Sequence, residues 1–181
     1  MRFEETSIPG VYIVDLEPHA DERGFFARAF CAREFAEHGL VPDVVQANMA
    51  LSNQMGTTRG LHFQTMAAPE AKFFRCINGE TFNVAVDARE GSSTFGRWVG
   101  IRLSATNRRA LYIPPSCAAG YQTLTDGAEV FYSISGYYTP DAERGLRYDD
   151  PTIGIEWPLT PTVVSEKDRG WAPLSPEMLH R

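Results

Sequence analysis

The chain has 181 residues, of which 43% are hydrophobic and 12% aromatic, a composition typical of one globular domain with a sizeable core. Its formal net charge of -6 argues against a general attraction to nucleic acid or to an anionic membrane, although a local basic pocket for a small anion remains possible. No apolar run is long enough to span a membrane, and the first residues, "MRFEETSIPG", lack the basic-then-apolar layout of a signal peptide. The three cysteines form no C-x-x-C motif, and we expect a cytoplasmic protein.

Short runs rich in β-branched and aromatic residues recur along the chain and are typical of β-strands. In chain order these runs are 11–16, 25–30, 59–64, 72–77, 81–88, 97–105, 110–114 and 129–138. One stretch, 31–40, favours a helix that ends at Gly39. The prolines from Pro151 to Pro176 leave room only for short helical or irregular pieces near the C-terminus.

Two dipeptides, Asn78-Gly79 and Asp126-Gly127, are typical of type I′ hairpin turns, because both central residues of that turn need positive φ. We therefore expect antiparallel strands joined by tight hairpins. Eight or more such strands in one domain must protect their edges, which a sandwich or a small barrel does. The prediction is an all-β fold, an antiparallel jelly-roll (cupin-like) barrel formed by a single domain over 1–181, with a few short helices and a pocket between the sheets.

The alternation of side chains along strands places His62, Lys72 and Tyr132 on faces where one pocket can collect them. Such a pocket would suit acid/base chemistry. Histidine titrates near neutrality, tyrosine can deliver a proton, and a lysine ammonium can stabilise a developing oxyanion. From spacing alone, the three residues could also simply satisfy hydrogen bonds at a barrel rim.

Metal binding is the other possibility for a barrel of this kind, but the ligands are missing. Metal-binding cupins use an H-x-H pair and a second histidine, whereas this chain has H-x-Q at 62–64 and no histidine within 114–121. His19, His38 and His180 lie near a loop, a helix end and the C-terminus. No G-x-G-x-x-G or P-loop motif occurs, so we predict neither a metal nor a cofactor.

Motifs spread over nearly the whole chain resemble those of the dTDP-4-dehydrorhamnose 3,5-epimerase family in their order and spacing. They are "DERGFF", "QANMALSN", "RGLHFQ", "KFFR", "VAVDAREGSSTFG", "LYIPPSCAAGY", "YYTPDAERGLRYDDP", "IEWP" and "SEKD". The resemblance implies a cofactor-free and metal-free jelly-roll homodimer. It also implies a reaction that inverts carbons beside the ketone of a nucleotide-diphosphate 4-keto-6-deoxyhexose.

The resemblance assigns the catalytic roles to four residues. His62 matches the general base, and Asp168 the carboxylate that orients it. Tyr132 matches the proton donor, and Lys72 the cation near the C4 oxygen. These residue types fit the chemistry, because a proton next to a ketone is acidic only if the enolate is stabilised, and inversion needs a base and an acid on opposite faces of the sugar.

The resemblance assigns a second set of residues to the nucleotide. Arg23, Arg59 and Lys167 would bind the diphosphate, to which arginine forks are suited, and Tyr138 would stack on the base. The family's N-terminal strands cross to the neighbouring subunit and help to complete its nucleotide site. Further implied contacts are Phe26, Gln46, Asn48 and Glu143.

Three positions depart from the family pattern. Ala119 and Asn83 stand where the family has a paired histidine and aspartate, and their joint replacement indicates either adaptation or drift. We therefore hypothesise that one carbon only, C3 or C5, is inverted. Arg28 replaces a glutamate near the base, which indicates a base other than thymine unless Arg28 turns to solvent or phosphate. A non-catalytic barrel that binds a nucleotide sugar is the alternative function.

Overall fold

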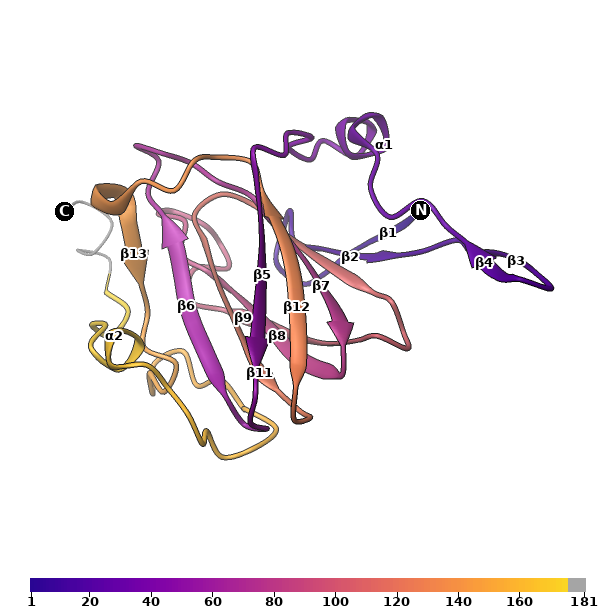
Figure 1. The fold of residues 1–181 in the computed structure, drawn as a ribbon. Coiled ribbons are helices and arrows are strands. Elements are labelled where there is room, and N and C mark those ends of the chain that lie inside the picture. Colours follow the sequence, from indigo (N-terminus) through magenta and orange to yellow (C-terminus); the bar gives the residue numbers. More distant parts are fainter. Residues whose placement is uncertain (176–181) are drawn as a thin grey trace.

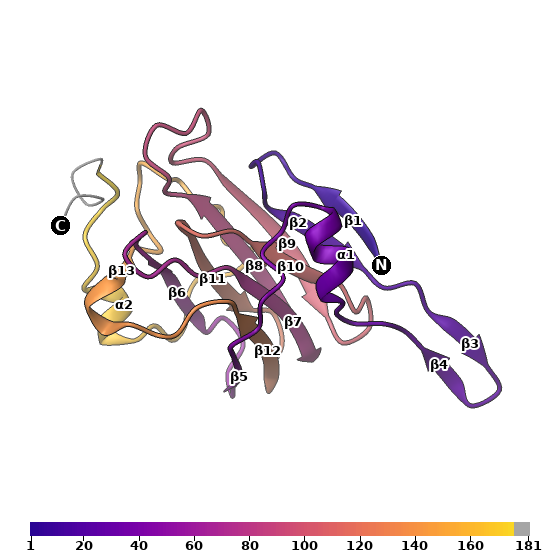
Figure 2. The same cartoon turned by 90° about the horizontal axis from the view of Figure 1, so that it is seen from above.

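The structure, a computed structural model, describes residues 1–175. Two antiparallel sheets lie face to face (Figure 1, Figure 2). In spatial order, the larger sheet contains β1 (Arg2–Glu5), β2 (Tyr12–Asp15), β10 (Ala110–Ile113), β7 (Lys72–Asn78), β12 (Ala128–Ile134) and β5 (Gln46–Ser52). The smaller sheet contains β13 (Glu143–Gly145), β6 (Thr58–Gln64), β11 (Cys117–Thr123), β8 (Glu80–Asp87) and β9 (Trp98–Ser104). The two sheets confirm the predicted all-β jelly roll.

The remaining elements are short. Strands β3 (His19–Asp21) and β4 (Gly24–Phe26) form a separate hairpin that projects from the body (Figure 1). Helix α1 (Ala32–Glu37) precedes β5, a 3-10 turn (Pro140–Ala142) precedes β13, and α2 (Glu166–Arg169) lies beside β6. The helix predicted over 31–40 is confirmed, with Gly39 at φ 71° beyond its end. No helix within residues 1–175 is long and apolar enough to cross a membrane.

The two predicted hairpin turns are wrong. β7 and β8 belong to different sheets, and so do β11 and β12, so that both turns carry the chain across the sandwich. Gly79 and Gly127 have positive φ, whereas Asn78 and Asp126 do not. The chain crosses between the sheets at both turns because the two turns pack against each other. The Asn78 side chain donates to the Gly127 carbonyl at 2.7 Å, and a Cβ on Gly79 would lie 2.2 Å from the Thr125 hydroxyl.

Strand boundaries also differ from the prediction where a polar or bent segment follows an apolar run. The run 25–30 ends as a strand at Phe26, and the run 129–138 ends at Ile134. The sequence pattern missed β11, whose letters "CAAGYQT" include small residues that are poor strand formers. Its position between β6 and β8 buries every one of its residues, so tertiary packing overrides propensity there. The other missed strands are β1, β3, β5 and β13.

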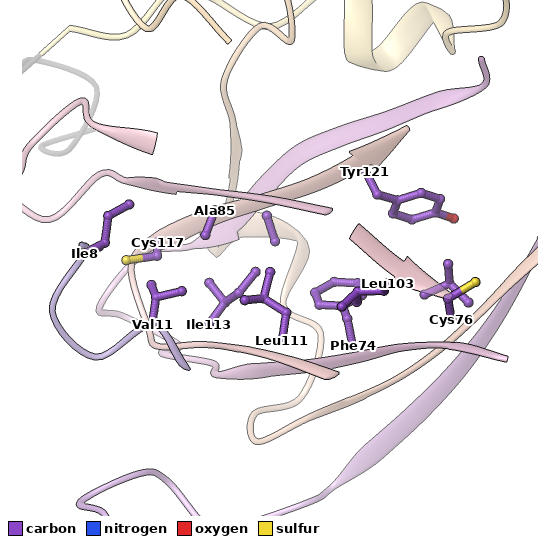
Figure 3. Packing of buried hydrophobic residues seen from close by; sticks show 12 residues of the cluster. Ile8, Val11, Phe74, Cys76, Ala85, Leu103, Leu111, Ile113, Cys117 and Tyr121 are labelled. Carbon is purple, nitrogen blue, oxygen red and sulfur yellow. The ribbon is translucent and has the colours of Figure 1, made fainter. Parts of the chain in front are cut away.

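A hydrophobic cluster fills the space between the sheets (Figure 3). Aliphatic side chains such as Leu103, Leu111 and Ile113 form one part of it, with Cys76 and Cys117 as buried free thiols. Cys31 is half-buried. Toward one end the cluster is bounded by three residues that also line a cavity, namely Phe74, Ala119 and Tyr121.

The loop between β8 and β9 is organised by a buried carboxylate. Asp87 is 0% exposed and accepts hydrogen bonds from the Arg89 guanidinium at 2.8 and 2.9 Å, from Ser92 at 2.6 Å and from Thr94 at 2.5 Å. Burial acts to raise the Asp87 pKa, but these donors outweigh it and hold the pKa at about 2. The carboxylate is therefore ionised at neutral pH and ties the loop to the end of β8.

Asp87→Asn is expected to lower the free energy of unfolding at neutral pH by about 2 kcal/mol, given 1.36 kcal/mol per unit of pKa difference. Because the folded pKa of about 2 lies below the ordinary value of 3.8, the stabilisation is fully present above pH 3.8 and is lost as the pH falls toward 2. Urea unfolding at several pH values from 7 down to 2 measures the free energy of unfolding of the wild type and of the variant. The wild-type and variant curves should converge at low pH, and a constant offset would contradict the prediction. Asp149→Asn, at an exposed pair with Arg147, is the control and should cost under about 1 kcal/mol.

Candidate active site

A cavity of about 370 Å³ opens between the two sheets and is lined by residues of both. His62 enters it from β6, Lys72 from β7 and Tyr132 from β12, so the pocket predicted from strand alternation is confirmed. The same three residues line an adjoining hollow of about 310 Å³, which extends toward Tyr138 and Glu143. The three side chains therefore line both spaces.

His62 and Asp168 form a pair joined by a short hydrogen bond. The His62 ring donates from Nε2 to Asp168 Oδ1 at 2.6 Å, and Asp168 Oδ2 accepts from the Gly60 amide at 3.1 Å. Ser165 caps α2 by accepting from the Asp168 amide, which fixes the carboxylate at the start of that helix. Burial acts to raise the Asp168 pKa, but hydrogen bonding and charge from His62 and the Gly60 amide outweigh it, so that the pKa lies below its usual value.

This pairing determines what His62 can do. An ionised carboxylate on Nε2 keeps a proton there, and thereby presents the other ring nitrogen, Nδ1, as the basic one. The Asp168 side chain is 5% exposed, whereas His62 is 33% exposed, so the buried partner supports a base that a ligand can reach. The negative charge also stabilises the imidazolium that forms when the base takes a proton.

Trp171 supports the same ring and was not predicted from the sequence. Its ring meets His62 edge to face, with centroids 6.2 Å apart. Gly145, opposite His62 on β13, makes room for it, because a Cβ on Gly145 would lie 2.2 Å from the indole. The only signal in the sequence would have been an aromatic residue shortly after the "SEKD" motif.

Lys72 is held on two sides. Its ammonium pairs with the Glu70 carboxylate at 2.6 Å and donates to the His62 carbonyl at 3.1 Å. Both side chains of the ion pair are at most 10% exposed, so the positive charge is fixed in a poorly hydrated place, where it acts strongly on a nearby oxygen. Glu70 was missed because nothing in its sequence context distinguishes it from a surface glutamate.

Tyr132 lines the cavity from the opposite sheet. Its ring stacks on Phe74 with centroids 4.8 Å apart. Burial raises the Tyr132 pKa, the charge of Glu70 raises it further, and Arg59 opposes both. The phenol therefore stays protonated at neutral pH and can act as an acid.

The residues predicted to bind the nucleotide fall into two groups, and the structure brings the first group to the cavity. Arg59 lies on the wall of the 370 Å³ cavity and is held by Ser52 at 3.2 Å and by the Leu51 carbonyl at 3.1 Å. Lys167 pairs with Glu143 at 2.7 Å, and Glu143 also accepts from the Tyr138 hydroxyl at 2.8 Å. Gln46 and Asn48 line the adjoining hollow, where Gln46 accepts from the Tyr138 amide.

The second group lies apart from the cavity of its own chain. Arg23 pairs with Asp21 on the projecting hairpin (Figure 1), and Phe26 at the end of the same hairpin is 75% exposed. Arg28 donates to Glu34 of α1 at 2.7 Å, so in this chain its guanidinium is engaged away from the cavity.

The two inward positions that depart from the family pattern are neighbours. Ala119 lies opposite His62 on β6 and lines the cavity. Asn83 lies opposite Tyr121 on the adjacent strand, buried at 1% exposure, and accepts from the Thr81 hydroxyl at 2.7 Å. The positions thus form one patch on the inner face of the smaller sheet, beside the candidate base.

Comparison with known proteins identifies the same family by a family model and by individual relatives. The family model described as dTDP-4-dehydrorhamnose 3,5-epimerase matches residues 5–176. A relative of that description from Methanothermobacter thermautotrophicus is 45% identical over 176 residues, which cover 96% of this chain and 94% of the relative.

Solved structures agree in fold. The epimerase of the same description from Bacillus anthracis, solved with TDP and PPi bound, superposes with a TM-score of 0.91 at 34% identity, covering 96% of this chain and 99% of that one. A 3′-monoepimerase from Streptomyces bikiniensis in complex with dTDP-quinovose superposes with a TM-score of 0.86 at 32% identity, covering 93% and 85%.

Proposed function

The chain belongs to the dTDP-4-dehydrorhamnose 3,5-epimerase family and is an epimerase, and from this premise we propose how its cavity acts. The substrate is a nucleoside-diphosphate 4-keto-6-deoxyhexose, bound with its sugar between the two sheets. The single observation that carries the proposal is the convergence of the His62–Asp168 pair, Lys72 and Tyr132 on one cavity. Family membership favours this over the non-catalytic binding barrel.

The reaction begins with proton removal next to the ketone. His62, kept basic at Nδ1 by its bond to Asp168, takes the proton from the carbon, and the electron pair of that C–H bond moves into an enolate. The negative charge grows on the C4 oxygen, where the buried Lys72 ammonium stabilises it. No external redox partner is needed, because the substrate gains and loses only a proton.

Inversion then requires a proton from the opposite face. Tyr132 reaches the cavity from the other sheet, so a flat enolate held between the sheets meets His62 on one side and the phenol on the other. Proton delivery from Tyr132 returns the electron pair to carbon and restores the ketone with inverted configuration. Solvent then exchanges the protons of the imidazolium and the phenolate.

Cationic and aromatic groups around the two spaces support binding of the nucleotide diphosphate. Arg59 and Lys167 border the cavity, and Lys167 can exchange its pairing with Glu143 for phosphate oxygens. Tyr138 lines the adjoining hollow and is 53% exposed, which suits stacking on a base. The relative solved with TDP and PPi supports this class of ligand.

A homodimer completes the site in this proposal. The edge strand β5 exposes Met49 and Leu51, and Phe131 lies directly opposite Met49 on β12, which gives an apolar outer face next to unpaired strand edges. A second copy of the chain covers this face. The projecting hairpin then reaches the neighbouring subunit and brings Arg23 and Phe26 to its cavity.

Phe131→Glu is expected to convert the dimer into a 20.2 kDa monomer in sedimentation, because the charge would be buried in the apolar face. Two inactive variants, His62→Ala and Arg23→Ala, test the exchange of hairpins. Mixed and refolded together, they should regain activity, since one site of the hybrid dimer holds both intact residues. A wild-type chain that sediments as a monomer at all concentrations would refute the dimer.

The inner patch at Ala119 and Asn83 supports inversion at one carbon only. The histidine of the family pattern is absent from the wall beside His62, and its aspartate partner is replaced by the buried Asn83, which reduces the support for a second sugar pose. The neighbour from Streptomyces bikiniensis, named as a 3′-monoepimerase, supports such an activity on this scaffold. The base-selecting role of Arg28 has weaker support, because Glu34 engages it.

We also propose that the chain forms a single domain and works in the cytoplasm, where free thiols such as Cys76 stay reduced. The central proposal is tested with dTDP-4-keto-6-deoxyglucose in deuterated water. Deuterium should enter a carbon next to the ketone, as followed by NMR. Absence of exchange on this and related nucleotide 4-keto sugars, while a family enzyme exchanges in parallel, would refute the proposed reaction.

A further inference from the structure

Glu70 is a buried carboxylate at the active site to which the proposed reaction gives no role. Its side chain is 7% exposed, lies 2.6 Å from the Lys72 ammonium and borders the hollow of about 310 Å³. Burying a carboxylate is unfavourable unless strong partners replace the lost water, and a buried ion pair often adds little to stability. The position of Glu70 therefore calls for a functional reason.

The backbone around Glu70 is fixed. Ala71, which separates Glu70 from Lys72, donates to the Ser135 hydroxyl at 2.8 Å and accepts from the Ser135 amide at 3.0 Å. Pairing with the segment that follows β12 thus continues one residue before β7. Gly136 packs closely on the same segment, because a Cβ there would lie 3.2 Å from the Glu70 Cβ. The carboxylate therefore starts from a backbone held by hydrogen bonds and by close packing.

This carboxylate determines how the Lys72 ammonium is oriented. An ammonium carries three N–H donors. Glu70 takes one at 2.6 Å and the His62 carbonyl takes another at 3.1 Å. Lys72 forms no third hydrogen bond with residues 1–175, so one donor stays available to a ligand in the spaces that Lys72 lines. Because the second anchor belongs to the candidate base, the two bonds fix the free donor relative to His62.

We propose that Glu70 is a positioning residue for the epimerisation, which holds the Lys72 ammonium so that its remaining N–H faces the C4 oxygen of the sugar. The inference rests on the proposed function and deepens it, because it names the residue that orients the cation at the enolate. A preorganised donor stabilises developing charge without having to reorganise. A displacement of about 1 Å at a reacting group can slow a reaction by about 100-fold.

The same carboxylate acts on Tyr132 through its charge. The charged and titratable groups that line the two spaces with Tyr132 are the Glu70–Lys72, His62–Asp168 and Lys167–Glu143 pairs, Arg59 and Tyr121. Burial raises the Tyr132 pKa most, Glu70 raises it further, and Arg59 lowers it. Removal of the Glu70 charge therefore lowers the Tyr132 pKa, and the phenol loses its proton at a lower pH.

Glu70→Gln keeps the size of the side chain and removes its charge. With dTDP-4-keto-6-deoxyglucose in deuterated water, we expect kcat for deuterium incorporation to fall by about 10- to 100-fold while KM changes by less than about 3-fold, because the lost interaction is made in the transition state. The alkaline limb of the kcat profile should move to lower pH, since Tyr132 must be protonated to act as the acid. Glu70→Asp keeps the charge but withdraws the oxygens from Lys72, so it should lower kcat without moving that limb.

Asp87→Asn is the matched control. It also removes a buried carboxylate from its pair with a cation, here Arg89, but Asp87 lines neither of the two spaces. It should lower the free energy of unfolding and leave kcat, KM and the alkaline limb unchanged. A double variant tests whether Glu70 acts through Lys72: Glu70→Gln with Lys72→Met should be no slower than Lys72→Met alone, because residues that act as a unit are not additive.

A readout without turnover separates this inference from the proposed reaction. NMR of ¹³C-labelled tyrosine follows the titration of Tyr132 in the ligand-free enzyme, with its signal assigned by its loss in Tyr132→Phe. Tyr132 should titrate at a lower pH in Glu70→Gln than in wild type or Asp87→Asn. Wild-type kcat in Glu70→Gln, an unchanged Tyr132 titration, or a double variant slower than Lys72→Met would overturn the inference. A wild type that exchanges deuterium on no sugar refutes the proposed reaction, whereas the titration still tests Glu70.

Discussion

His62→Ala is expected to lower kcat/KM for deuterium exchange by about 10²- to 10⁴-fold, the usual contribution of a positioned general base. The imidazole is the reachable member of the pair with Asp168, and among residues 1–175 no other histidine lines the cavity. Asp168→Asn should lose a similar factor, because the amide no longer stabilises the imidazolium or holds the ring in the required tautomer. Exchange at the sugar carbons, followed by NMR in deuterated water, measures both.

The double variant provides the sharper test of the pair. If Asp168 acts through His62, then removing both should cost no more than removing His62 alone, because the effects of residues that act as a unit are not additive. His38→Ala is the matched control, since His38 lies on the surface with its ring bonded to the Glu34 carbonyl. Multiplicative losses in the double variant would mean that Asp168 supports the fold or another group instead.

The sequence pattern could bring together the side chains that lie on regular strands, whereas their catalytic roles came only from the family resemblance. Residues two apart on a strand share a face, so His62, Lys72 and Tyr132 could be brought to one pocket without coordinates. Asp168 could be placed only by the "SEKD" motif, because it reaches His62 from a four-residue helix that no periodicity indicates. Trp171 and Glu70 act through packing and ion pairing, which individual residue types do not reveal.

The turn predictions failed for a related reason. A dipeptide such as Asn78-Gly79 specifies a tight local turn, but it does not specify which sheet the next strand joins. In a jelly roll the choice depends on long-range pairing, here of β7 with β10 and β12, and of β8 with β9 and β11. The Gly79 conformation was consequently predicted correctly while the strand pairing around it was not.

A second prediction concerns how many carbons of the sugar the enzyme inverts. Double inversion requires the base to reach C3 and C5 in succession, with the sugar shifting or its ring flipping between the steps. Polar groups around the sugar stabilise each pose. Ala119 stands in the cavity wall opposite His62, and the buried Asn83 lies diagonally across from it on β8, so the histidine–aspartate pair of the family pattern is absent from this part of the smaller sheet. We expect the wild type to incorporate deuterium at one carbon about 100- to 1,000-fold faster than at the other, the effect of losing one catalytic hydrogen bond of ~2.7–4 kcal/mol.

The reverse substitution tests the cause. Ala119→His together with Asn83→Asp restores the family pair on one face of the sheet, where the two positions are diagonal neighbours across β8 and β11. The variant should raise the slower exchange toward the faster one, whereas Ala119→His alone should not, because the imidazole would lack its carboxylate partner. NMR in deuterated water resolves C3 from C5 and reports the configuration of the product. Comparable wild-type rates at both carbons, with a doubly inverted L-sugar as product, would refute single inversion and show that Ala119 and Asn83 do not limit the second step.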